Sequence, residues 1–169
     1  MSVEIVNVST NDCIDCVVTL AREIWTQHFT PIIGESQVKY MLMKFQSADA
    51  IKSQISGGSK YYLAKVENEW VGYICLIPDL DNHKMILSKI YVKKSMRGKG
   101  LGKSMLDHAE KICASEKFSS LLLTVNKFND APISWYKRHG FLLIDEVKKD
   151  IGSGFFMDDY IMEKTVLNC

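Results

Sequence analysis

Apolar residues in the first third of the chain recur at helical spacing. Polar residues suited to capping a helix occupy 9–12, and the apolar residues that follow three and four positions apart are Val17, Leu20, Ala21, Ile24 and Trp25. Pro31 and Gly34 then interrupt the pattern. The elements predicted here are a strand over 2–8, a helix ending near residue 27, a break over 28–34, and helices over 35–45 and 48–55.

From residue 60 the pattern changes to that of strands. Two segments rich in residues that favour strands lie on either side of the dipeptide Glu67-Asn68, and this pattern is typical of a β-hairpin. The predicted elements are strands over 60–66, 70–77, 84–92, 121–125, 141–148 and 155–164, with helices over 101–115 and 129–139. This order predicts a single α/β domain over residues 1–169, with a mixed, mainly antiparallel sheet flanked by helices.

Composition narrows the function classes. The 169 residues carry a formal net charge of +1, which gives no global attraction for nucleic acid or an anionic membrane. The N-terminus lacks the basic and apolar regions of a signal peptide, and no apolar run approaches the roughly 18 residues that span a bilayer. We therefore expect a cytoplasmic protein with neither nucleic acid nor membrane as a partner.

Five cysteines are odd in number and scattered, which argues against a disulfide framework. Cys13 and Cys16 have the CxxC spacing of redox and zinc sites. No second pair with ligand spacing accompanies them, so a structural role and no metal are expected.

A glycine-rich turn separates the strand over 84–92 from the helix over 101–115. Its glycines are Gly98, Gly100 and Gly102, and its cationic residues are Arg97, Lys99 and Lys103. The first N–H groups of a helix have no acceptor within the helix, and its dipole favours negative charge at that end. The turn is therefore a candidate phosphate site, although a glycine loop without a ligand would have the same composition.

The spacing of these glycines distinguishes three kinds of phosphate site. A P-loop needs glycine five positions before Gly102, where Arg97 stands, and a Rossmann fingerprint needs GxGxxG. The segment from Arg97 to Gly102 instead matches the Q/R-x-x-G-x-G/A box of the GNAT N-acetyltransferases. Downstream, the segment 123–141 resembles the LxVxxxNxxAxxxYxxxGF pattern of the same family.

The two ordered motifs identify the chain as similar to the GNAT family over its whole length, which implies the acyl-CoA N-acyltransferase fold and acetyl-CoA as co-substrate. By this resemblance the strands over 84–92 and 121–125 splay apart around acetyl-CoA. Main-chain groups of Ile90, Tyr91 and Val92 would pair with pantetheine, and Asn129 would contact the cofactor. The residues whose amides would hold the pyrophosphate are Arg97, Gly98, Lys99, Gly100, Leu101, Gly102 and Lys103.

Tyr136 resembles the general acid of the family. The leaving thiolate belongs to an acid with a pKa of roughly 8.5, and a phenol with a pKa of roughly 10 stays protonated at neutral pH and can donate to the sulfur. The alternative for Tyr136 is an aromatic side chain that is only packed and hydrogen-bonded. The base that deprotonates the amine stays open, because His28, Glu35, Asp79 and Asp81 are equally compatible with surface roles.

The last predicted strand contains adjacent carboxylates, Asp158 and Asp159, which a cationic substrate would explain. The strings over 152–162 and 41–47 resemble the Pai-type bacterial acetyltransferases, which act on spermidine and spermine. The two aspartates would then bind the amine substrate, or else they twist or cap an edge strand. A protein Lys or N-terminal acetyltransferase and a non-catalytic acetyl-CoA-binding regulator are the alternative functions, and a homodimer is expected because late strands often pair in this superfamily.

Overall fold

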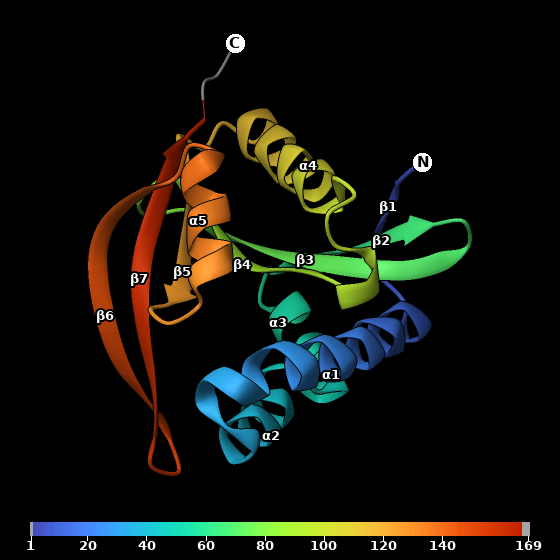
Figure 1. The fold of residues 1–169 in the computed structure, drawn as a ribbon. Coiled ribbons are helices and arrows are strands. Elements are labelled where there is room, and N and C mark those ends of the chain that lie inside the picture. Colours follow the sequence, from blue (N-terminus) through green and yellow to red (C-terminus); the bar gives the residue numbers. More distant parts are fainter. Residues whose placement is uncertain (1, 167–169) are drawn as a thin grey trace. The chain divides into compact units, whose positions relative to one another are not determined.

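The computed structural model describes residues 2–166 and contains, within that range, seven strands, five α-helices and one short 3-10 helix (Figure 1). The strands are β1 (Glu4–Asn7), β2 (Lys60–Val66), β3 (Glu69–Asp79), β4 (Lys84–Val92), β5 (Ser120–Asn126), β6 (Leu142–Gly152) and β7 (Phe155–Thr165). The helices are α1 (Asn11–Ile33), α2 (Glu35–Phe45), α3 (Ala48–Ser56), η1 (Lys94–Met96), α4 (Leu101–Ser115) and α5 (Asp130–Arg138). The mixed, mainly antiparallel sheet with flanking helices confirms the predicted fold class.

These elements fall into two compact parts. The first contains the residues up to Ile77 together with Lys89–Ala109, and the second contains Pro78–Ser88 and the residues from Glu110 onward. Strands β3 and β4 and helix α4 contribute residues to both parts. That all 169 residues form one domain stays a prediction.

In the first part, strands β1, β2, β3 and the end of β4 follow one another in hydrogen-bonding order. The β2–β3 hairpin turns at Glu67 and Asn68, whose φ angles of 50° and 65° match the type I′ turn expected for a two-residue loop. Helices α1, α2 and α3 contact one another (Figure 1). The apolar residues predicted for one face of the first helix are all buried: Val17, Leu20, Ala21, Ile24 and Trp25.

The predicted break at 28–34 is wrong, because α1 continues through Pro31 to Ile33. Proline lacks an N–H and therefore removes a helical hydrogen bond, but here it lies in the last turn. The Gly34 N–H still donates to the Thr30 carbonyl at 3.0 Å. Gly34 itself has a φ of 88° and ends the helix. Burial of Phe29 supplies apolar contact in the same turn.

Lys89 in β4 is a buried ammonium group, 7% exposed, whose donors are met by oxygens. Its Nζ donates to the Phe45 carbonyl at 3.0 Å, to Gln54 Oε1 at 3.1 Å, and to the Tyr61 hydroxyl. Phe45 ends α2 and Gln54 lies in α3, so one cation connects both helices to the sheet. Burial lowers the pKa of Lys89 to about 8.

The stability of the folded chain is expected to rise with pH above 8 because of Lys89. The folded chain releases this proton near pH 8, whereas the unfolded chain holds it to about pH 10.5, so the unfolded state binds more protons between these values. Between pH 8 and 10 the gain is about 2 kcal/mol. Urea unfolding at several pH values checks this, with Lys89→Met losing the gain; equal pH slopes in both proteins would contradict it.

In the second part, the start of β4 is followed by β5, β7 and β6 in hydrogen-bonding order. Strand β4 runs parallel to β5, whereas β7 is antiparallel to both β5 and β6. Strand β6 of the long β6–β7 hairpin continues to Gly152, beyond the predicted end at residue 148 (Figure 1). The prediction ended too early because the exposed, charged residues of this strand show no apolar alternation from which its end could be placed.

Strand β6 occupies the edge of the sheet in this part and exposes Leu142, Leu143 and Ile144. Exposed apolar residues on an edge strand are suited to pairing with another chain. The homodimer stays a prediction. No helix within residues 2–166 is long and apolar enough to cross a membrane.

Candidate active site

The glycine-rich turn adopts a conformation that glycine permits at two positions. Gly98 and Gly100 have φ angles of 77° and 80°, in the region that other residues rarely adopt. A Cβ at either position would meet no protein atom within 4 Å, so conformation and not crowding inside the protein demands glycine there. The open space beside the turn leaves its main chain approachable.

Helix α4 begins directly at this turn. The Ser104 N–H donates to the Gly100 carbonyl at 3.1 Å. The N–H groups of Leu101, Gly102 and Lys103 precede that bond, and helix geometry gives them no acceptor within the helix. The N-terminus of a 15-residue helix therefore presents a set of donors and the positive end of the helix dipole.

The three cations of the turn have different partners. Arg97 Nε donates to the Val92 carbonyl at 3.1 Å and so ties the turn to the end of β4. Lys103 forms an exposed ion pair with Asp107 at 3.0 Å. Lys99 makes no ion pair with any residue between 2 and 166, so its charge is available to a ligand.

The end of β4 is held by aromatic packing. The Tyr91 ring lies 5.5 Å from Tyr73, 5.6 Å from Trp25 and 6.1 Å from Phe29, between ring centroids. The parallel ladder with β5 pairs residues 84–86 with 120–122, and Ile90–Val92 lie beyond it along β4. The main chain predicted to pair with pantetheine therefore belongs to a segment fixed by its side chains.

Gly72 in β3 positions the same segment and was not predicted from the sequence. A Cβ at this residue would lie 2.5 Å from the Tyr91 carbonyl oxygen and 3.3 Å from the Met105 side chain. Contacts as short as 2.5 Å do not occur, so a side chain here would displace the main chain of β4. A glycine inside an apolar strand signals such a close approach, and that signal was present in the sequence.

Gly72→Ala is expected to lower the free energy of unfolding by about 1–3 kcal/mol, as in other overpacked sites. It should also weaken acetyl-CoA binding, because the Tyr91 main chain, which we predict to pair with pantetheine, must move. Gly57→Ala is the control, since its Cβ would meet only ordinary contacts at 3.5 Å. Thermal unfolding and titration calorimetry measure both effects; a Gly72→Ala protein as stable as the control would contradict the prediction.

In the second part of the chain, α5 begins where the downstream motif predicts. Asn129 precedes the helix, is 5% exposed, and accepts from the Ile133 N–H at 3.1 Å through its carbonyl. Pro132 lies in the first turn, where its missing N–H is not needed. His139 follows the helix, stacked on Trp135 with its Nδ1 2.8 Å from the Trp135 carbonyl oxygen.

Tyr136 is buried in α5. Its ring contacts Trp135 and Phe141 edge-on, with both centroid distances at 5.5 Å. Its hydroxyl has no hydrogen-bond partner among residues 2–166, unlike the hydrogen-bonded phenol of the purely structural alternative. Burial raises the pKa of Tyr136, so the phenol keeps its proton at neutral pH.

The two aspartates of β7 have different environments. Asp158 pairs with Lys127 at 3.1 Å, and Lys127 also pairs with Glu146 at 3.1 Å. Asp159 is 5% exposed and makes no such pair with the residues that the structure describes, 2–166. Two other carboxylates considered for proton transfer are also engaged: Glu35 pairs with Lys39 at 2.9 Å, and Asp79 accepts from the Asn82 side chain at 2.8 Å.

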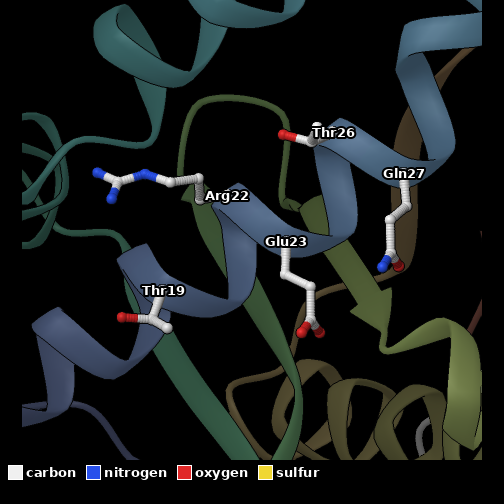
Figure 2. A pocket seen from close by; sticks show the side chains of 5 residues that line it. All are labelled: Thr19, Arg22, Glu23, Thr26 and Gln27. Atoms are coloured by element: carbon white, nitrogen blue, oxygen red, sulfur yellow. The ribbon is translucent and has the colours of Figure 1, made fainter.

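One surface hollow, of about 390 Å³, lies along α1 and does not include any of the predicted site residues. Figure 2 shows that its five side chains all come from that helix and that Arg22 and Glu23 extend in different directions. The residues lining it are Thr19, Arg22, Glu23, Thr26 and Gln27. Cys13 and Cys16 are both free, and residues 2–166 contain no group of three or more His, Cys, Asp or Glu arranged to hold a metal.

Comparison with known proteins finds N-acetyltransferases, the class to which the two sequence motifs point. The chain is 26% identical to the spermidine N(1)-acetyltransferase of Thermoplasma acidophilum over 163 residues, which cover 94% of this chain and 97% of the relative. It is 26% identical to an uncharacterised N-acetyltransferase of Lactobacillus delbrueckii subsp. lactis over an alignment that covers 98% of each chain. The solved PaiA N-acetyltransferase of T. acidophilum in complex with coenzyme A matches with a TM-score of 0.80 and 26% identity, over 98% of this chain and 99% of that one.

The fold and the two motifs define an N-acetyltransferase that depends on acetyl-CoA. The model of the acetyltransferase (GNAT) family matches residues 20–141, and the chain belongs to this family. The predicted family, its similarity to the Pai-type enzymes and its class as an acyltransferase are thereby confirmed.

Proposed function

We propose that this enzyme transfers the acetyl group of acetyl-CoA to a primary amine of a polyamine such as spermidine or spermine. The buried Asp159 carboxylate, which makes no ion pair within residues 2–166, is the observation that carries an amine acceptor, since an ammonium group would satisfy it. The choice of a polyamine among amines is supported by the spermidine N(1)-acetyltransferase that matches nearly the whole chain.

The cofactor roles follow the motifs residue by residue. The amides from Arg97 to Lys103 bind the pyrophosphate, with Lys99 adding an uncommitted charge. The main chain of Ile90, Tyr91 and Val92 pairs with the pantetheine amides, and Asn129 contacts the cofactor. The open space beside Gly98 and Gly100 and the donors at the start of α4 support the first of these roles.

Tyr136 acts as the general acid in this proposal. The amine nitrogen attacks the thioester carbonyl carbon, the C–S bond breaks, and its electron pair stays on the CoA sulfur. The phenol then gives its proton to the sulfur. Its burial, which keeps it protonated, supports this role, as does a hydroxyl that has no hydrogen-bond partner within residues 2–166.

A thiol-release assay with acetyl-CoA tests the acceptor class. The acceptors compared are spermidine, spermine, a peptide with a free N-terminus, and a Lys-containing peptide with a blocked N-terminus. We expect turnover with the two polyamines alone. Turnover with a peptide alone would replace the polyamine by a protein acceptor, and tight acetyl-CoA binding without any turnover would indicate a regulator.

A further inference from the structure

Asp159 lies in the middle of β7, between two other strands. It stands opposite Asn126 of β5 and Val147 of β6 in the strand register. The side chain is 5% exposed, and its carboxylate forms no hydrogen bond or ion pair with any residue from 2 to 166. A buried carboxylate without a partner is costly, so this position is unusual for a residue with only a structural role.

The charged groups that the strand register places beside Asp159 on β6 and β7 are engaged elsewhere or lie at the surface. Asp158 points to the opposite face of β7 and shares Lys127 with Glu146. On the face of β6 that carries Val147, Asp145 accepts from the Glu146 N–H at 2.8 Å, and Lys149 is exposed. Further along the same face of β7, Glu163 pairs with Lys84 and accepts from Ser120 at 2.8 Å.

On β5, the neighbouring Asn126 is also committed. Its Oδ1 accepts from the Phe128 N–H at 2.9 Å, which fixes the amide against the following turn. Among the described residues of this part of the chain, 78–88 and 110–166, no cation therefore pairs with Asp159. Burial, with a smaller contribution from Asp158, raises the pKa of Asp159 to about 6.

We propose that Asp159 is the proton acceptor of the reaction: it binds the ammonium group of the acceptor and removes one proton from it. This inference rests on the proposed amine acetylation but not on the polyamine itself. An alkylammonium with a pKa near 10.4 is less than ~0.1% neutral at pH 7, so the enzyme needs such a group to produce the free amine.

The proton balance of the reaction is closed by this assignment. The ammonium gives a proton to the Asp159 carboxylate, and the freed nitrogen lone pair forms the C–N bond with the thioester carbonyl carbon. The C–S bond breaks, the CoA sulfur takes the Tyr136 proton, and the second proton of the nitrogen restores the phenol directly or through solvent. Asp159 then releases its proton to water, which leaves amide, free CoA and one proton.

The test compares Asp159→Asn and Asp158→Asn in the full chain from pH 5 to 9, with spermidine varied at saturating acetyl-CoA and acetyl-CoA varied at saturating spermidine. For the parent enzyme we expect kcat/KM for spermidine to rise with pH through an apparent pKa near 6. Asp159→Asn should lower kcat by about a hundredfold and lose this rise, with KM for acetyl-CoA changed less than threefold. Asp158→Asn should keep the rise, and Asp159→Glu should recover part of kcat.

The inference is overturned if Asp159→Asn keeps the rise of kcat/KM, or if both asparagine variants behave alike. Circular dichroism and thermal unfolding establish whether Asp159→Asn folds; if it does not, a parent pH profile without a rise between pH 5 and 7 overturns the inference on its own. If only a peptide is acetylated, the polyamine proposal fails and the same variants are measured with that peptide, so the two failures are distinct.

Discussion

Replacing Tyr136 with Phe is expected to lower kcat about a hundredfold and to change KM for acetyl-CoA less than threefold. The phenylalanine ring keeps both edge-on contacts, with Trp135 and Phe141. Only the hydroxyl is lost, and general acid catalysis typically contributes a factor of about 10²–10⁴. Steady-state kinetics with a polyamine acceptor measures both constants.

Stability separates this prediction from a structural role for the tyrosine. The Tyr136 hydroxyl makes no hydrogen bond within residues 2–166, so its removal should change the free energy of unfolding by less than about 0.5 kcal/mol. Tyr160→Phe is the matched control, because it removes a phenol from β7 that has no role in the proposed mechanism. An unchanged kcat in Tyr136→Phe would leave this residue as packing alone.

Strong periodicity predicted most of the fold. The helix over 35–45 and the strands over 60–66 and 84–92 were placed to the residue, because apolar spacing marks all three and glycines lie just before the first two. Because of Pro31, the end of α1 was predicted too early. The sequence does not distinguish a proline in the last turn of a helix from a proline that follows the helix.

The site was less accessible from sequence because it depends on which side chains lack partners. Alternation places Asp158 and Asp159 on opposite faces of a strand, but it does not say which of them meets a cation. The position of Lys127 in the structure shows that Asp158 is paired, whereas Asp159 has no ion pair within residues 2–166. The need for glycine at residue 72 likewise becomes clear only from its contact with the Tyr91 carbonyl, which lies far from it in the sequence.

The double variant Gly98→Ala and Gly100→Ala is expected to weaken acetyl-CoA binding about a hundredfold. Each alanine at a φ near 80° costs about 1–2 kcal/mol, so the turn leaves the conformation that presents its N–H groups. The added methyl groups also occupy the open space in which we propose that the pyrophosphate lies. Titration calorimetry with acetyl-CoA and with CoA measures the loss.

Gly58→Ala separates this loss of binding from the general cost of a strained turn. Gly58 also has a positive φ, 108°, and open space around its would-be Cβ, but it lies between α3 and β2. It should therefore destabilise the chain by about 1–2 kcal/mol and leave acetyl-CoA affinity within about twofold. Because pyrophosphate binding is largely electrostatic, the affinity of the parent enzyme should also fall with salt more steeply than that of the double variant. Equal affinities for the parent and the double variant would show that the turn between β4 and α4 does not bind the cofactor.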